Sequence, residues 1–518
     1  MPRRTDPANG LEQWWQDLRQ AGRGLWRSRA FSAAAVLTLA LGIAGTTVMF
    51  TLVEGVLLRP LPVRDQQSLL VAWKENPAAA VAHWPFDARQ LDALSREGRA
   101  LGTLAGASYY GAGSGVVFEN GSASYLRGAA VTGAFFEVLG VGPELGRALS
   151  PADDRTGAAN VLVITHALWQ RRYGGSRDVL GRRLQIGDQP FTIVGVMPPD
   201  IGYPRGVEAW MTLAAGASIE MNPAFREGLL RDVDLVARLR PGATLEQARS
   251  ELAGWVTRLE AESSAESLRG MRPVVRPYAD VVVGDVRSAM LVLLAAVVLV
   301  LLIASANVAN LLLLRGETRR RELAMRSALG AGRGRLSRQL FAESLLLSLL
   351  AGLLAFAASG SLLRAVVELV PGGLPRLESV RADPLVALFA LGVVLLAATL
   401  AGIAPVAFLR RIDLAAELQG ARAVGAGSGA RRGRRGLVMA QVALAVTVVA
   451  AAGLLMRSLL WLQTVEMGLA ADRLVFVELA PLPSQPGASA RQREAFHDAV
   501  VAQLEAAPGI EGATPVHT

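Results

Sequence analysis

Residues 288–314, SAMLVLLAAVVLVLLIASANVANLLLL, contain no charge, and residues 315–339, RGETRRRELAMRSALGAGRGRLSRQ, follow them directly. The apolar part is long enough to cross about 30 Å of hydrocarbon as a helix. Eight arginines then fall between Arg315 and Arg338. A basic cluster at one end of a crossing marks the end that stays in the cytoplasm. The stretch therefore predicts a membrane crossing that leads into a short cytoplasmic element, residues 315–340.

The composition agrees with a membrane protein. Hydrophobic residues make up 52% of the 518 residues, charged residues only 19%, and the mean hydropathy is +0.35. The net charge of +9 could indicate nucleic acid as a partner. However, much of the positive excess lies beside hydrophobic runs, where the positive-inside rule explains it better. We expect the lipid bilayer as a partner and no nucleic acid.

Several kinds of chemistry are excluded or not supported. The absence of cysteine excludes disulfides, thiolate catalysis and cysteine-ligated zinc. Lys74, the only lysine, follows no Gly-rich loop, so these residues contain no P-loop, GxxxxGK[ST], for ATP. Asp153-Asp154 fits a helix cap or loop better than a metal pair. We expect no enzyme activity, catalytic residue, cofactor or metal. None of the histidines has metal-ligand spacing, and each is expected as a surface or loop residue: His83, His166, His497 and His517.

Four more uncharged runs predict crossings. The first begins at Ala30 and continues past Glu54, which is too long for a cleavable signal peptide, so we assign 1–29 to a cytoplasmic segment and 30–56 to a crossing. Residues 344–363 and 384–409 complete a segment of three crossings, 288–409, and 436–462 is the fifth crossing. Residues 410–435 are basic and Gly-rich, which predicts a flexible cytoplasmic linker. The basic segments alternate with 57–287 and 364–383, so we expect the N-terminus inside, and residues 57–287 and 463–518 outside.

Residues 57–287 have mixed polarity and no spanning run. We expect strands at 68–73, 160–166, 191–197 and 234–239, and helices at 87–98, 133–139, 167–173 and 244–262. The last helix begins with Thr244-Leu-Glu-Gln247, a capping-box pattern. Strands and helices without regular alternation indicate an α+β domain. The predicted fold class is thus an α-helical transmembrane bundle of five crossings with a large α+β extracytoplasmic domain.

The N-terminal segment has an amphipathic pattern. Arg19, Arg23, Arg27 and Arg29 supply charge beside an apolar set that is expected near one helix face, which favours a helix in the membrane interface; packing on protein is the alternative. The apolar set is Leu11, Trp14, Trp15, Leu18, Leu25 and Trp26.

The arginine-rich element also predicts a short helix. Glu322 and Arg326 are one turn apart and can pair, residues such as Met325 and Leu329 give an apolar side, and Gly330 ends the helix. It could lie in the membrane interface or dock a cytoplasmic protein, and the pattern alone does not separate these two alternatives.

The order that follows the first crossing recurs after the fifth. Asp65, a strand at 68–73, a Pro-containing loop and a helix correspond to Asp472, a strand at 473–479, a Pro-rich loop and a helix that opens at Ser489. Either a second, incomplete copy of the outer domain begins at 463–518, or a generic strand–helix order coincides.

Long motifs resemble the ABC-transporter permeases of the MacB/FtsX type, most like the duplicated permeases called ADOP. They include WWQDLRQAGRGLWRSRAFSAAAVLTLALGIAG from position 14, VTGAFFEVLGVGPELGRALSPADD from 131, and ANVANLLLLRGETRRRELAMRSALGAGRGRLSRQLFAES from 306. The resemblance implies a MacB-like periplasmic core domain at 57–287, an FtsX-like permease domain at 288–409 and a bacterial inner-membrane location. The full duplicated form has more crossings, so we expect a chain that is truncated in its second half.

The resemblance also implies a partner and a mechanism. A separate ABC ATPase would contact the cytoplasmic surface, and ATP hydrolysis would change the conformation of the periplasmic domain for efflux or for lipid or lipoprotein handling. A second permease half or a homodimer is a further expected partner. A non-transport sensor or regulator that uses the same mechanics is the alternative function. The ATPase-coupling residues would be Arg320, Arg321, Glu322, Met325, Arg326, Leu329 and Gly330.

Overall fold

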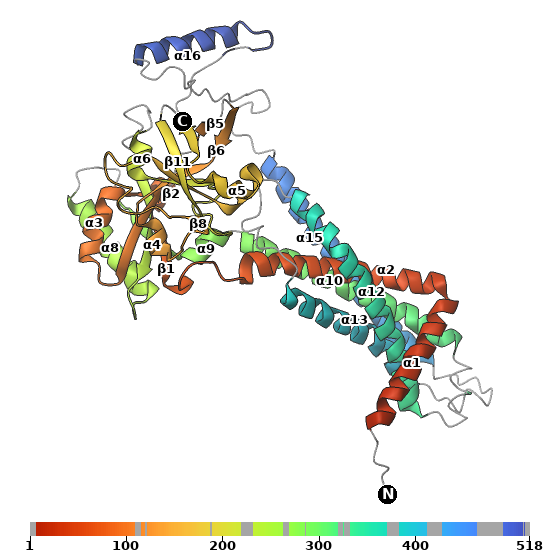
Figure 1. The fold of residues 1–518 in the computed structure, drawn as a ribbon. Coiled ribbons are helices and arrows are strands. Elements are labelled where there is room, and N and C mark those ends of the chain that lie inside the picture. Colours follow the sequence, from red (N-terminus) through yellow and green to blue (C-terminus); the bar gives the residue numbers. More distant parts are fainter. Residues whose placement is uncertain are drawn as a thin grey trace. The chain divides into compact units, whose positions relative to one another are not determined.

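The chain folds into two compact units (Figure 1). The helical unit is built from Met1–Arg59 and Val283–Leu474, and the sheet unit from Pro60–Val282 and Val475–Thr518. The computed structural model describes residues 7–108, 115–119, 122–186, 189–218, 232–262, 269–284, 286–319, 325, 332–369, 383–411, 427–463, 490–510 and 512.

The helical unit contains the five predicted crossings. Within the described residues, five helical segments are long and apolar enough to span a membrane, which confirms the predicted number. The linker prediction is partly wrong, because the last helix begins at Gly427 and the end of the 410–435 segment is therefore helical. The helices of this unit are α1 (Pro7–Arg27), α2 (Arg29–Val53) with a π-helical turn (Glu54–Leu58), α10 (Val286–Thr318), α12 (Arg333–Leu369), α13 (Pro384–Arg411) and α15 (Gly427–Gln463).

Small residues let α2 and α10 pack closely. A Cβ on Gly42 of α2 would lie 3.1 Å from the Cα of Leu301 and 3.3 Å from the Cβ of Ala304. In a bilayer, lipid tails are as apolar as leucine, so close van der Waals packing holds helices together. Leu301 belongs to one buried cluster that also contains Ile43, Leu347 and Ala397, so α2, α10, α12 and α13 share a single core.

The sheet unit confirms the predicted α+β class. Each of the four predicted strands and four predicted helices is present to within a few residues. Its strands are β1 (Leu69–Asn76), β2 (Val81–Trp84), β3 (Phe86–Asp87), β4 (Leu101–Ser108), β5 (Gly115–Glu119), β6 (Ser122–Leu126), β7 (Gly128–Val131), β8 (Leu145–Gly146), β9 (Val161–Ile164), β10 (Arg183–Ile186), β11 (Gln189–Val196), β12 (Ala209–Thr212), β13 (Asp232–Leu239) and β14 (Arg272–Pro277). The helices that accompany them in the chain are α3 (Ala88–Glu97), α4 (Phe135–Leu139), α5 (His166–Tyr173), α6 (Leu213–Ser218), α8 (Leu245–Glu262), α9 (Tyr278–Val283) and α16 (Ala490–Glu505).

The strands form one mixed sheet in the order β14-β1-β13-β4-β7-β12-β9-β11-β10-β5-β6. The pairs β7–β12 and β9–β11 are parallel, whereas β1 is antiparallel to both β13 and β14. Alternate residues of β1 enter different cores: Leu69 and Val71 pack with α4 and α9, and Leu70 and Ala72 pack with α3 and α8. This period of two buries both faces of the strand.

Capping boxes fix the starts of the two helices on the second of these faces. At α8, the Thr244 amide donates to Gln247 Oε1 at 2.8 Å and the Gln247 amide to Thr244 Oγ1 at 3.2 Å, as the sequence predicts. Asp87 and Gln90 cap α3 in the same way. The helix predicted after Ser489 is α16, whereas the strand predicted at 473–479 lies outside the described residues.

Replacing Gly195 with alanine should destabilise the sheet unit. A Cβ at this position would lie 2.0 Å from the carbonyl oxygen of Arg147, where β11 pairs with β8, so backbone must move. Such overpacking costs about 1–3 kcal/mol of unfolding free energy. Thermal unfolding of the full chain in detergent, followed by tryptophan fluorescence, measures this loss. Gly254→Ala is the matched control, since a Cβ there, in the middle of α8, would meet no atom within 4 Å and should stabilise slightly. An equal effect of both substitutions would contradict this reading of the β8–β11 contact.

Candidate functional site

Within the predicted cytoplasmic element 315–340, we call residues 320–331 the coupling element, and the structure describes this part only at Met325. Arg320, Arg321, Glu322, Arg326, Leu329 and Gly330 lie outside the described residues. Met325 is helical and 54% exposed. The end of α10 and the start of α12 flank this element, and the structure describes both flanks.

A buried carboxylate joins the two flanks. The Glu343 side chain on α12 is 6% exposed, and its Oε1 lies 3.4 Å from Nη1 of Arg319, at the end of α10. Its Oε2 lies 3.9 Å from Nη1 of Arg315, which is one turn earlier on α10. Because an unpaired buried charge is costly, the two arginines and the carboxylate hold the ends of α10 and α12 together.

Helix α1 contacts both flanks. Arg338 on α12 donates through Nε to Asp17 Oδ2 at 2.6 Å, and the Asp17 side chain is 8% exposed. Arg315 on α10 donates through Nη2 to the carbonyl oxygen of Gly24 at 2.6 Å, and its guanidinium lies 4.9 Å from the ring centroid of Phe31 at the start of α2. We call Asp17, Arg315, Arg319, Arg338 and Glu343 the base cluster.

The sequence pattern indicates the arginines of the base cluster but does not predict their acidic partners. Asp17 is the one acid between Trp15 and Arg29, and Glu343 stands at the edge of an otherwise uncharged run. An acid in such a place is a signal for a pair, because it is expensive near hydrocarbon.

The expected single apolar face of α1 is wrong. Leu25 is buried, whereas Trp15 is 69% and Trp26 72% exposed. Buried positions recur every four residues at Asp17, Ala21 and Leu25, which puts these three on the side that packs on the unit. Trp15 and Trp26 therefore lie on a different side from the one that contains Leu25.

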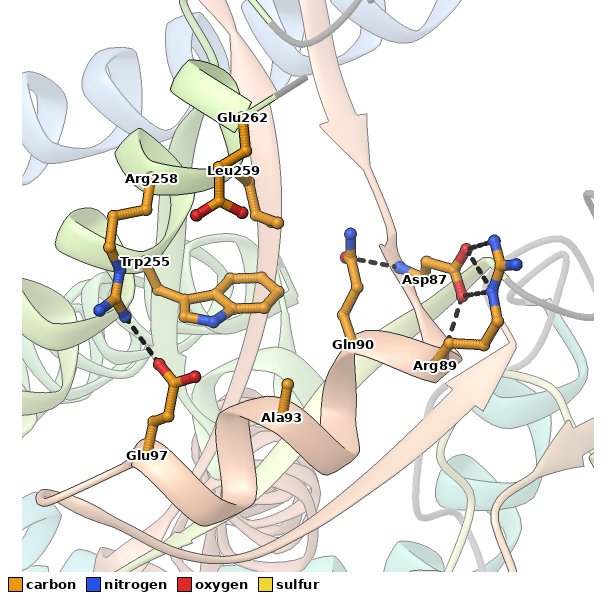
Figure 2. Close-up of a pocket in the computed structure, with 9 residues that line it drawn as sticks. All are labelled: Asp87, Arg89, Gln90, Ala93, Glu97, Trp255, Arg258, Leu259 and Glu262. Atoms are coloured by element: carbon orange, nitrogen blue, oxygen red, sulfur yellow. Dashed lines mark hydrogen bonds and ion pairs between the residues drawn. The ribbon is translucent and has the colours of Figure 1, made fainter.

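A second candidate site is a cavity of about 380 Å³ between α3 and α8 in the sheet unit (Figure 2). The Trp255 indole forms one wall, and Arg258 Nη2 lies 3.0 Å from Glu97 Oε2 beside it. Arg89 pairs with Asp87 on the other side. Polar groups of both signs around an aromatic wall could bind a small polar molecule. Its lining is Asp87, Arg89, Gln90, Ala93, Glu97, Trp255, Arg258, Leu259 and Glu262.

Lys74 is a residue of β1, and its charge interacts with that of Asp87. Its side chain is buried and its Nζ is 5.0 Å from the ring centroid of Phe86. Burial lowers the pKa of Lys74 from 10.5 to about 8, and the negative charges of Asp232 and Asp87 oppose this shift. The folded chain therefore holds this proton less tightly than the unfolded chain does.

The histidine expectation is wrong for His83. This residue lies in β2, and its Nε2 is 2.7 Å from Oδ1 of the buried Asp234, which also accepts a hydrogen bond from the Tyr203 hydroxyl at 2.9 Å. The pair holds β2 to β13. Among the described residues, no group of three or more histidine, aspartate and glutamate side chains could hold a metal ion.

The acid pair Asp153-Asp154 caps backbone, as expected. Asp153 Oδ2 accepts from the Ser150 amide at 2.9 Å, and Asp154 accepts from the amides of Gly133 and Ala214. Burial raises the pKa of Asp154, although these amide bonds oppose the shift. The two carboxylates therefore stabilise a loop.

Replacing Glu343 with glutamine should destabilise the helical unit. Arg315 and Arg319 would lose their shared negative partner, which should cost about 1–3 kcal/mol. The melting temperature of the full chain in detergent measures this cost. Glu317→Gln is the matched control, because Glu317 is an exposed acid near the same end of α10 and its change should stay within about 0.5 kcal/mol. Equal melting temperatures for the two variants would show that Glu343 does not stabilise the base cluster.

Lys74 predicts a rise in stability at alkaline pH. Between pH 8 and 10.5, the unfolded chain binds this proton more than the folded chain, so the free energy of unfolding should rise with pH by about 3 kcal/mol and be constant below that window. Lys74→Met should remove the rise. Chemical unfolding at several pH values compares the two chains, and tyrosine titration affects both alike. A persistent rise in the variant would assign it to other groups.

Two parts of the chain match models of known protein families. Residues 32–254 match the model of the MacB-like periplasmic core domain, and residues 294–414 match that of the FtsX-like permease C-terminal domain. Together the matches cover about two thirds of the chain.

Curated relatives are distant. The chain is 24% identical over 369 residues to the pyoverdine export ATP-binding/permease protein PvdT of Pseudomonas syringae pv. syringae, covering 68% of this chain and 53% of that protein. It is 24% identical over 377 residues to the macrolide export ATP-binding/permease protein MacB 2 of Aeromonas hydrophila, with the same coverage of both, 68% and 53%. The chain thus spans about half the length of these relatives.

A solved structure is also similar. The periplasmic region of MacB from Actinobacillus actinomycetemcomitans aligns with a TM-score of 0.33 and 11% identity, over 46% of this chain and 95% of that one. The two domain models, in the order that the resemblance implies, are the stronger finding. They identify a membrane protein with an extracytoplasmic domain. The chain belongs to the MacB/FtsX type of ABC-transporter permeases.

Proposed function

We propose that this chain is the permease subunit of an ABC-type complex in the bacterial inner membrane, and that it couples ATP hydrolysis by a separate ATPase to a conformational change of its periplasmic domain. The work served is efflux or lipid or lipoprotein handling. The relatives' names contain both "ATP-binding" and "permease", whereas these 518 residues contain no P-loop. ATP must therefore be bound outside these residues.

The base cluster is the observation that carries the proposal. A segment that transmits a force from a partner must be attached at both ends to the helices that it moves. Without such attachment, only the segment itself would change conformation. Arg319 and Glu343 join the two helices that flank the coupling element, and Arg338 joins the second flank to α1. A displacement of residues 320–331 would thus move α1, α10 and α12 together.

Orientation is part of the proposal. The N-terminus and the coupling element lie in the cytoplasm, and residues 57–287 and the C-terminal tail lie in the periplasm. The positive-inside bias of 1–29, 315–338 and 410–435 supports this placement. The contacts of α1 with both flanks support it too, since they bring two of the basic segments to the same end of the helical unit.

The docking surface comprises Arg320, Arg321, Glu322, Met325, Arg326, Leu329 and Gly330. The exposure of Met325 fits a helix with an available apolar side, which suits a groove on a partner protein. Charges on the same segment would fix the register of the contact.

Swapping two charges tests the docking surface. Glu322→Arg combined with Arg326→Glu keeps an ion pair one turn apart but reverses its polarity toward the partner, so the helix should persist while binding of the ATPase weakens at least tenfold. Co-purification and titration with a MacB-type ABC ATPase of the same host measure binding.

Arg335→Glu is the control for this swap. It changes an exposed charge at the start of α12, outside the docking surface, and should leave binding within about twofold. Unchanged binding in the swap variant, or an equal loss in the control, would contradict the proposal.

A further inference from the structure

The exposed side of α1, which we call its outward side, contains tryptophan and arginine, whereas its inward side packs on the unit through Asp17, Ala21 and Leu25. Trp15 and Trp26 are eleven residues apart, which is about three helical turns, so both exposed indoles lie on one side. Arg19 and Arg23 lie between them on nearby positions of that side and are exposed. Neither indole packs into the buried clusters of the unit.

The charge of this side is unbalanced. Between Trp15 and Arg29 the chain contains one acid, Asp17, and it is turned inward to Arg338 at 2.6 Å. Arg27 is also exposed at the end of the helix. The outward side from Trp15 onward is therefore aromatic and cationic, and the chemistry that complements it is anionic with an adjoining apolar layer.

The chain places this side at a membrane boundary. Helix α1 ends at Arg27, and α2, which is long and apolar enough to span a bilayer, begins at Arg29. The Arg29 guanidinium lies 4.9 Å from the Trp26 ring centroid, a cation–aromatic contact next to the junction. Tryptophan and arginine at the end of a spanning helix are typical of the headgroup layer.

We propose that the outward side of α1 binds the headgroups of anionic phospholipids and that this contact sets the position of the coupling element. Headgroup binding is inferred from the exposed tryptophans and arginines alone. The effect on the coupling element rests on the proposed function. It follows from the hydrogen bonds of Asp17 to Arg338 and of Gly24 to Arg315, because a shift of α1 acts on both flanks. Each arginine near an anionic surface strengthens the contact about fivefold.

The test uses the full chain in lipid nanodiscs. Gln20→Cys gives an exposed labelling position on α1 in a chain that has no other cysteine. A spin label there should become less accessible to a water-soluble nickel relaxation agent when phosphatidylglycerol replaces part of the phosphatidylcholine, and high salt should reverse this change. Equal accessibility in both lipids, as expected if the surface instead docks a protein, would overturn the proposal.

Charge variants show whether this surface is responsible. In Arg19→Gln with Arg23→Gln, the affinity for the anionic surface should fall about thirtyfold, so the phosphatidylglycerol fraction that gives half the effect should rise or the effect should vanish. These positions are exposed, so the packed side of α1 is untouched. Arg335→Gln with Arg435→Gln removes the same charge from exposed positions on α12 and α15 and should change the midpoint less than twofold. An equal shift in both pairs would reduce the effect to general surface charge and overturn the proposal.

A second label tests the effect on the coupling element separately from headgroup binding. A spin label at Met325→Cys should change mobility with phosphatidylglycerol, and Asp17→Asn should weaken that change while the α1 label still responds. A silent label at 325 beside a responsive one at 20 would overturn the link to the coupling element. Neither readout involves an ATPase, so failure of the proposed docking surface would be seen separately, in the binding measurement with the charge swap.

Discussion

The buried carboxylate of Glu343 is the constraint on which the cytoplasmic end of the helical unit depends. Its side chain is 6% exposed and lies between Arg315 of α10 and Arg319, the residue that follows this helix. Burying a carboxylate and two guanidinium groups away from water is unfavourable unless they pair with one another, so this contact links the positions of α10 and α12. The coupling element connects these two helices, and both of its ends are consequently fixed.

Much of this architecture could be predicted from the sequence, because it depends on local pattern. Uncharged runs gave the five spanning helices, and alternating or capped patterns gave strands such as β9 and helices such as α8. The order of the sheet could not be predicted in this way, because β1 pairs with β13 and β14, which lie more than 150 residues along the chain. Such pairings depend on how the side chains of whole sheet faces pack together, and the pattern of a single strand does not predict that packing.

The candidate site was less predictable than the fold. Periodicity grouped Leu25 with Trp26, although adjacent residues on a helix point about 100° apart, and packing on the unit selected Leu25. The partners Asp17 and Glu343 are about 320 and 24 residues from Arg338 and Arg319, and only the fold brings these charges together. His83 likewise appeared as an isolated residue until the sheet placed Asp234 beside it.

A second set of charges fixes the opposite end of α2. The helix continues into the π-helical turn Glu54–Leu58, and Arg59 follows this turn. Arg59 Nε lies 3.5 Å from Glu54 Oε1, and its Nη2 lies 2.9 Å from Oδ2 of Asp383, the residue before α13. A π-helical turn departs from the regular hydrogen-bond ladder, and such turns often occur at functional positions. Because Pro60 follows directly and begins the sheet unit, one continuous backbone runs from Asp17 of the base cluster through α2 to that unit. Between the two charged ends, the shared core that includes Ile43 and Leu301 resists deformation. We infer that a displacement of α2 at its Arg29 end would be transmitted to the π-helical turn. Deforming either the paired ends or the packed core between them would be energetically unfavourable.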